Sequence, residues 1–232
     1  QLFQTSKNLR IDETLVSAMD SIAQGIQKST PFNVVLISLH NPKSGLLTRI
    51  VSAGLDEQAF AQAQAHQQPW SGIAQLMKSE FEIGNLYFLP FDKAPIIPAD
   101  VHIITTMTES EKKPNAWDPD DFLLIPLEDT QGNPLALISL DDPSNGLRPD
   151  RATIESLEAF AAQAALSIQN AHRFGELRNR VDALSAGLQR QQKLLNVTKN
   201  DVPILLRKDL EQTISLHNLE RRTQRVRAGL VI

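Results

Sequence analysis

The side chains with most capacity for chemistry are five histidines, because the chain contains no cysteine. They are His40, His66, His102, His172 and His217. No two of them stand at the i, i+4 spacing that places a metal-binding pair on one helix face. The absence of thiols also excludes thiolate zinc sites and cysteine nucleophiles. We therefore expect neither metal nor haem ligation, and interpret each histidine as a surface or packing residue.

Two other groups of residues could belong to a catalytic site, but the residues around them do not support this interpretation. His217 lies in a helical segment where a histidine kinase would carry its phospho-acceptor, but the next residue is not acidic and no glycine-rich ATP-binding segment follows. The acidic cluster of Asp118, Asp120 and Asp121 beside Trp117 is typical of turn residues that cap and solubilise. No phosphate loop and no Ser-His-Asp order is found. We expect no enzymatic activity.

Aromatic residues offer a better candidate site, which would bind a small molecule. Small-molecule pockets usually have apolar and aromatic walls with a few polar groups. The predicted ligand-binding residues are Trp70, Tyr87, Phe88, Phe91, His102 and Trp117. The alternative is that these aromatic side chains simply form the core.

Composition places the chain among globular proteins of 232 residues, since 41% of its residues are hydrophobic and 22% are charged. Its apolar runs are far shorter than a membrane span requires, so we expect no membrane segment and a cytoplasmic location. The sequence starts without methionine and stops at the apolar segment 229–232. We expect it to belong to a longer polypeptide that carries an output domain.

Charge is divided unevenly along the chain. Residues 1–172 carry 11 Lys and Arg against 21 Asp and Glu, a net charge of −10. Residues 173–232 carry 12 against 6, a net charge of +6. A basic arm can bind nucleic acid, but these basic residues are spread out and no aromatics alternate with them. Nucleic-acid binding is therefore not expected to be their main role.

Hydrophobic periodicity predicts the elements that must position such a site. Apolar residues at spacings of four and three predict a first helix from Ile11 to Ile26, capped by Asp12 and ended before Pro31. Two further helices are predicted over 57–67 and 70–77. The predicted strands are 32–39, 46–53, 86–89, 122–127 and 135–140, in two hairpins and one single strand.

One irregular segment interrupts this pattern. Residues 90–119 contain five prolines and one further predicted strand, 101–105. A long loop inside a compact domain is usually functional or disordered. We expect this segment to cover the ligand site.

A long helix is predicted from Asp150 onward. Its first part carries a wide apolar stripe that should lie on the sheet. Its later part has apolar residues at the a and d positions of a heptad repeat, which predicts a dimeric coiled coil. The predicted dimer interface is Phe174, Leu177, Val181, Leu184, Leu188 and Leu195. Gln191 and Thr198 weaken the seam, and Pro203 predicts a break followed by a second helix.

Four segments within 121–178 form a recognisable pattern: FLLIPL at 122–127, GNPLALISL at 132–140, LEAFAAQAA at 157–165, and IQNA at 168–171 with a phenylalanine three residues later. Through these residues the stretch resembles the GAF family of sensor domains. The resemblance covers about residues 10–178. It implies an α+β fold with a central antiparallel sheet of five or six strands flanked by helices.

The resemblance, the heptad repeat and Pro203 together predict a domain organisation. Residues 1–172 would be a GAF-like sensor domain and 173–200 a parallel coiled-coil signalling helix. Residues 201–232 would be a second linker helix leading to the output domain.

Members of the family bind cyclic nucleotides, bilins, haem, amino acids or other small molecules, or dimerise without a ligand. Lack of cysteine disfavours bilin attachment and the branch that reduces methionine sulfoxide, and the signature of cyclic-nucleotide-binding members is not found. The cofactor stays unknown.

Three functions remain open. The first is a sensory or regulatory domain that binds a small molecule and signals through a homodimeric helix. The second is a ligand-free dimerisation module. The third is a DNA-linked regulator that uses the basic C-terminal helices.

Overall fold

Seven antiparallel strands form one sheet in the computed structural model. The model describes residues 13–93 and 115–228. Within the last helix it describes the side chains of residues 151–193, 195 and 204–223. The described helices are α1 (Glu13–Ser29), α2 (Glu57–Ala65), α3 (Trp70–Ala74) and α4 (Arg151–Ala228), with short 3-10 turns η1 (Ser79–Phe81) and η2 (Phe91–Lys93). The strands are β1 (Phe32–Asn41), β2 (Leu46–Ala53), β3 (Gln68–Pro69), β4 (Glu82–Ile83), β5 (Leu86–Leu89), β6 (Phe122–Glu128) and β7 (Pro134–Pro143).

The strand order is β3-β2-β1-β7-β6-β5-β4. The two hairpins predicted from sequence, β1–β2 and β6–β7, meet in the middle, where β1 pairs with β7. The expected number of strands was five or six. The sheet exceeds it because β3 and β4 each contain two residues, too few to leave a periodic pattern in the sequence.

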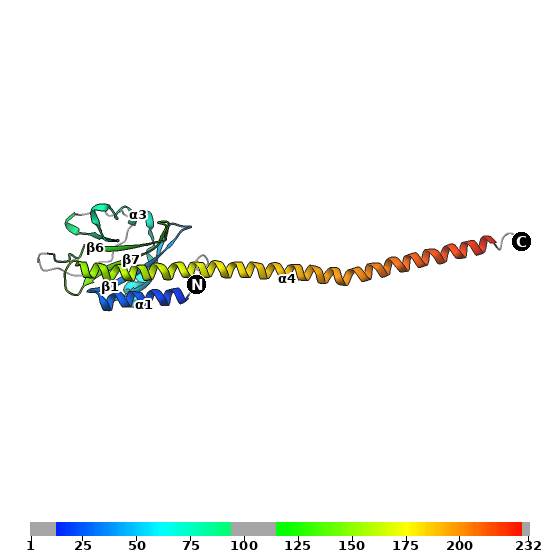
Figure 1. The fold of residues 1–232 in the computed structure, drawn as a ribbon, viewed down its shortest axis with the longest axis horizontal. Helices are drawn as coiled ribbons and strands as arrows, with labels where there is room; N and C mark the ends of the chain where they lie inside the picture. The colour runs from blue at the N-terminus through cyan, green and yellow to red at the C-terminus, as the bar shows by residue number, and fades with distance from the viewer. Residues whose placement is uncertain (1–12, 94–114, 229–232) are drawn as a thin grey trace. The chain divides into compact units, whose positions relative to one another are not determined.

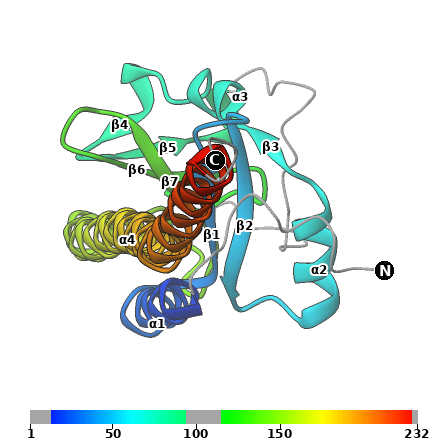
Figure 2. The same cartoon turned by 90° about the vertical axis from the view of Figure 1, so that its right-hand side faces the viewer.

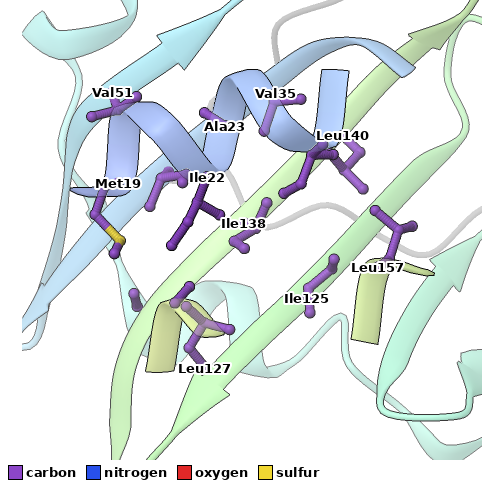
Figure 3. Close-up of a cluster of buried hydrophobic side chains, with 14 of the residues drawn as sticks. Met19, Ile22, Ala23, Val35, Val51, Ile125, Leu127, Ile138, Leu140 and Leu157 are labelled. Carbon is purple, nitrogen blue, oxygen red and sulfur yellow. The ribbon is translucent and has the colours of Figure 1, made fainter. Parts of the chain in front are cut away.

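One face of the sheet is covered by α1 and the first part of α4, which lie side by side (Figures 1 and 2). Their apolar stripes meet the alternate residues of the strands that point to this side. Figure 3 shows this core, with Met19, Ile22 and Ala23 of α1 and Leu157 of α4 over the sheet. Burial of these side chains, about 1.5–3 kcal/mol for each large one, is the main force that holds α4 on the domain.

The opposite face carries α2, α3 and a smaller apolar cluster (Figure 2). It consists of Leu47, Ile73, Leu76, Phe81, Leu89, Leu124 and Leu137. Both faces of the sheet are therefore buried in its centre, which is why β1 and β7 read as nearly continuous apolar runs.

The turn after β2 depends on a glycine. Gly54 has φ +89°, a conformation that residues with a Cβ rarely adopt. A Cβ at Gly54 would lie 1.9 Å from the carbonyl oxygen of Asn33. The close approach of the two chains at this corner therefore requires glycine.

Helix α4 begins after Asp150, as predicted, and Asp150 accepts a hydrogen bond from the backbone N–H of Thr153 at 2.8 Å. The predicted break at Asn200–Pro203 is wrong, because α4 is one helix from Arg151 to Ala228. A proline inside a helix costs about 3 kcal/mol relative to alanine, and α4 nevertheless continues through this position.

The chain divides into two compact units, residues 1–173 and 174–232. The second unit contains the later part of α4 and is described separately below. Among the described helices, none is both long enough and apolar enough to cross a bilayer.

Candidate functional site

A cavity of about 70 Å³ lies on the face of the sheet that carries α3. Its apolar wall comes from the strands and from the segment around α3, and consists of Val34, Leu36, Ile73, Leu76, Phe122, Leu123, Leu124 and Leu140. Its polar lining consists of Ser38, Arg49, Gln68, Ser139 and Asp141. A largely apolar wall with a few polar groups is the composition expected of a small-molecule site.

Strand alternation explains why this cavity exists. Val34, Leu36 and Ser38 point to the same face of β1, and Ser139 of β7 pairs with Leu36. Serines at the centre of the sheet are much smaller than the aliphatic residues around them. The floor of the sheet is therefore lowered at Ser38 and Ser139, and the residues that the structure describes leave the space above it unfilled.

Arg49 is a buried cation in the cavity wall, with 8% of its surface exposed. It stands opposite Ser38 in the β1–β2 ladder. Its Nη1 donates to the carbonyl oxygens of Ala63 and His66, each at 2.7 Å, at the end of α2. Last-turn carbonyls of a helix need such donors, so Arg49 also fastens α2 to the sheet.

Burial lowers the pKa of the Arg49 guanidinium, because desolvation disfavours its charged form. A guanidinium nevertheless stays protonated in proteins at neutral pH. Arg49 therefore brings a positive charge into a largely apolar region. The sequence did not identify this residue as part of a site. Without the fold, a buried arginine in a strand cannot be distinguished from an exposed one.

Asp141 contributes negative charge to the same cavity. Its Oδ1 accepts hydrogen bonds from the indole Nε1 of Trp117 at 3.2 Å and from the backbone N–H of Asp142 at 2.7 Å. Asp141 pairs with Val34 on β1, whereas Arg49 pairs with Ser38. Their partners on β1 are thus four positions apart, roughly 13 Å along the strand, and Arg49 and Asp141 lie on opposite sides of β1.

Two of the predicted aromatic residues lie near the cavity without lining it. Trp70 and Tyr87 pack against the smaller apolar cluster, and the Trp70 ring lies 5.8 Å from the ring of His40. Burial raises the pKa of Tyr87, and the negative charges of Glu82 and Glu128 add to this effect. The Tyr87 hydroxyl therefore stays protonated at neutral pH.

The other predicted residues are placed elsewhere. Trp117 is fully buried in the larger core on the α1 side, with Phe32 and Phe88 at centroid distances of 5.5 and 5.7 Å. Phe91 is half exposed, and His102 is outside the described residues, as is the predicted strand 101–105. The structure does not gather the described aromatic residues into one wall. Ligand contact by them stays a prediction.

Asp121 has a structural position that its sequence context did not reveal. It is 1% exposed and accepts the backbone N–H of Phe91 at 2.7 Å and that of Asp118 at 3.0 Å. The Nε of Arg148 donates to it at 3.0 Å, and the same guanidinium lies over the Phe88 ring at 5.2 Å. Asp121 thus joins three loop segments rather than simply solubilising a turn.

The described histidines are dispersed. The Nδ1 of His40 lies 3.0 Å from the carbonyl oxygen of Pro134, and that of His66 lies 3.0 Å from the carbonyl oxygen of Gln62. His172 and His217 are exposed on α4. Over residues 13–93 and 115–228, no three His, Asp or Glu side chains are grouped so that they could hold a metal ion.

The predicted dimer residues are exposed on α4 in this single chain. Phe174, Leu177, Val181, Leu184, Leu188 and Leu195 have 55–70% of their surface accessible. The helix continues with more apolar residues in the same state, among them Leu206, Leu210 and Ile214. Pairing of these residues with a second chain stays a prediction.

Comparison with known proteins identifies the fold. No protein-family model and no curated protein matches the sequence. Solved structures do match. The GAF domain/HD domain protein from Geobacter sulfurreducens has a TM-score of 0.50 and 10% identity, covering 67% of this chain and 92% of that one. The GAF domain from Acinetobacter phosphoenolpyruvate-protein phosphotransferase has a TM-score of 0.50 and 16% identity, covering 68% and 84%. The α+β fold predicted from the sequence is thus confirmed as that of GAF domains.

Proposed function

We propose that this GAF-fold chain is a sensory or regulatory module that binds a small molecule in the cavity beside Arg49 and signals through a paired α4. The observation that carries the proposal is the continuity of α4. The same helix buries Leu157, Ala164 and Ile168 in the core of the sheet domain and presents an exposed heptad stripe from Phe174 onward. A shift of the helix at the sheet therefore has a direct covalent route to the paired segment.

Pairing with a second copy is favoured by the spacing of the stripe. A repeat of seven with apolar a and d positions matches an identical helix through a left-handed supercoil. Each exposed Leu, Val or Phe that becomes buried contributes about 1.5–3 kcal/mol before the cost of association is subtracted. Six such residues per chain give the seam enough apolar surface for a stable dimer.

Signalling requires that the ligand prefer one of two states of the module. A ligand can shift an equilibrium only by its difference in affinity for the two states. Linkage then requires that dimer formation and ligand binding change each other by the same factor. The paired α4 and the cavity are the two sites that such coupling would connect.

The test is the oligomeric state of the full chain with and without a damaged seam. In Leu184→Glu a charge replaces a d-position residue. In the control Ala186→Glu the same charge stands at an f position, on the outer side of the heptad. We expect a dimer by sedimentation equilibrium for the wild type and the control, and at least tenfold weaker association for Leu184→Glu. A monomeric wild type at high concentration, or equal behaviour of the two variants, would refute the relay.

A ligand-free dimerisation module is the second candidate, and the size of the cavity favours it. Pockets for drug-sized ligands measure about 300–1,000 Å³, against about 70 Å³ here. This candidate predicts the same dimer but no bound compound in native mass spectrometry of the purified chain. It also predicts that no small molecule changes the dimer dissociation constant.

A further inference from the structure

The apolar seam of α4 extends beyond the residues predicted for the dimer interface. α4 is unbroken over its whole length, so the heptad frame that starts with Phe174 at position a continues through Pro203 without a shift. Pro203 occupies an outward b position in this frame. Later a and d positions are held by Leu205, Leu216 and Leu219, whose surfaces are 62–67% exposed. The second unit of the chain therefore offers one long stripe to a partner helix.

The positions that flank this seam carry positive charge. In a coiled coil, residues at e and g lie beside the apolar a and d positions and decide which helices can pair. Over residues 173–222, the charged residues at e and g are six Lys or Arg and two Asp or Glu. The basic ones are Arg173, Arg178, Arg180, Lys199, Lys208 and Arg222, and the acidic ones are Asp201 and Glu220. Both edges of the seam therefore have a net positive charge.

Neighbours on the same helix do not neutralise these charges. The basic side chains at e and g that the structure describes are all exposed: Arg173, Arg178, Arg180, Lys208 and Arg222. Among the described side chains of residues 173–223, none of these five is joined to a carboxylate. The ion pair found in this range joins Arg207 to Glu211 at 3.5 Å, and these two residues stand at the outward f and c positions. The basic edges are thus available to a partner.

A second copy of the same helix cannot compensate these charges. In a parallel dimer each g residue faces the e residue five positions later on the partner. In the sequence, none of the seven such pairs between Arg173 and Glu220 joins opposite charges, and one of them places Arg173 against Arg178. The edges of a homodimer therefore contribute repulsion without attraction.

One position inside the seam adds to this repulsion between copies. Asp209 is exposed, stands at an a position and is the one charged residue among the a and d positions of 174–223. In a homodimer two Asp209 carboxylates would face each other, with Lys208 of each chain at the adjoining g position. A polar residue at a costs stability and restricts which helices fit. A helix with Lys or Arg at this layer fits better than a second copy.

The seam also distinguishes such a helix from other anionic partners. A membrane-bound helix needs a broad apolar face, whereas this seam is two positions wide in each heptad and is interrupted by Gln191, Asp209 and Gln212. DNA attracts basic residues through its phosphates and offers no apolar surface to a leucine stripe. An acidic helix uses both the basic edges and the apolar residues between them.

We propose that α4 pairs, in exchange for its second copy, with an acidic helix of another protein. This helix has apolar residues at a and d, Glu or Asp at e and g, and Lys or Arg at the layer of Asp209. The inference rests on the proposed pairing surface of α4 and names a partner that competes for it. Exchange of one copy for this partner separates the two sensor domains and thereby regulates the proposed relay.

The experiment compares three synthetic peptides matched in length to residues 173–223. The first has Val at a, Leu at d, Glu at e and g, and Lys at the layer of Asp209. The second differs by carrying Lys at e and g, and the third by carrying Asp at the layer of Asp209. Fluorescence anisotropy measures their binding to the full chain at 10 mM and 500 mM salt, and sedimentation velocity gives the composition of the complex.

We expect the first peptide to bind at least about a hundredfold more tightly than the second at 10 mM salt, and at least about fivefold more tightly than the third. The complex should contain one chain and one peptide. Its affinity should fall as salt rises, because salt screens attraction between the edges. The homodimer has repelling edges, so it should respond to salt in the opposite direction.

Substitutions on α4 assign the binding to the seam and its edges. Arg178→Glu should weaken the first peptide about fivefold at 10 mM salt, whereas Arg190→Glu makes the same change at an outward c position and should bind like the wild type. Asp209→Leu should abolish the preference for the first peptide over the third. Leu184→Glu should weaken binding at least tenfold, and its outward control Ala186→Glu should not.

The outcomes separate the acidic partner from the proposed relay. Equal binding of the first and second peptides, or no binding of the first, would overturn the acidic partner, while a wild-type homodimer would still support the relay. A monomeric wild type that binds the first peptide would refute the relay and support the acidic partner. Tighter binding of phosphatidylglycerol vesicles or of a DNA duplex than of the first peptide would also overturn it, and would assign the basic edges to that polyanion.

Discussion

Two buried charged residues were the hardest to find in the sequence: Arg49 in the cavity wall, and Asp121 just before β6. Arginine and aspartate are mostly exposed in proteins, so Arg49 and Asp121 read as surface residues. The sequence analysis selected aromatic residues as the ligand site instead. One of them, Trp117, is a core residue whose Nε1 donates a hydrogen bond to Asp141. Only the pairing of strands, which a single sequence does not specify, shows that Arg49 stands over a hollow in the sheet.

Removal of the Asp121 carboxylate should destabilise the domain. Asp121→Asn keeps the shape but loses the charge that faces Arg148, and its amide cannot accept all three hydrogen bonds as well. We expect a loss of about 2–4 kcal/mol in the free energy of unfolding, measured by urea denaturation, because a buried charge pair is broken. Asp92→Asn is the matched control: Asp92 contacts the same arginine from the surface at 3.4 Å and should cost less than about 1 kcal/mol. Equal losses would contradict the assigned role.

The turn at Gly54 gives a second test at this scale. Gly54→Ala combines an unfavourable positive φ with a Cβ 1.9 Å from the Asn33 carbonyl oxygen. Gly45→Ala is the control, since Gly45 also has a positive φ, +69°, but no atom within 4 Å of its Cβ position. We expect about 1–2 kcal/mol for Gly45→Ala and at least about 3 kcal/mol for Gly54→Ala, because strain and collision add. Thermal unfolding of both variants measures the difference, and identical shifts in Tm would disprove the collision.

At the scale of elements, long periodic segments were predictable and short ones were not. The first helix, the two hairpins and the start of α4 at Asp150 follow from hydrophobic periodicity and capping. β3 and β4 contain two residues each and depend on neighbours that are distant in the sequence. The cavity belongs to the same class of unpredictable features, because it arises from how α3 and β6 approach β1 rather than from any one segment.

Pro203 was misread because local rules treat a proline as a helix terminator. In the continuous α4 this position has no N–H to donate to the carbonyl four residues earlier. Pro203→Ala should restore that hydrogen bond and stabilise the surrounding turns by up to about 3 kcal/mol. Amide hydrogen exchange over residues 199–207 should then slow by up to about a hundredfold. Asn200→Ala improves helix propensity alone and should slow this exchange less than about fivefold. Equal slowing by the two substitutions would show that the missing N–H of Pro203 does not destabilise the helix.

At the scale of the whole molecule, charge should regulate the proposed dimer. In a parallel coiled coil, a g residue faces the e residue five positions later on the partner. With Phe174 at a, these positions are Arg173 and Arg178, both exposed in the single chain. Two arginines therefore face each other on each side of the seam, and the long helix carries the positive charge that the sequence showed in residues 173–232.

Salt should consequently strengthen the wild-type dimer. A rise from 10 mM to 500 mM salt screens the repulsion, since the Debye length falls from about 30 Å to a few ångströms. Arg178→Glu replaces repulsion by attraction and should tighten the dimer about fivefold at low salt, with the opposite salt dependence. Arg190→Glu makes the same charge change at an outward c position and should have little effect. Sedimentation equilibrium at both salt concentrations measures this, and a wild-type dimer that weakens with salt would exclude the parallel register.

The two shortest strands have a consequence for how copies of this protein can join. β3 and β4 stand at the two rims of the sheet, each offering two residues of backbone to anything that approaches. A strand of two residues gives an incoming strand little template, so neither β3 nor β4 itself favours fibril growth or strand exchange between molecules. Association through the backbone of these two strands is thereby discouraged, and contacts between side chains can govern assembly there.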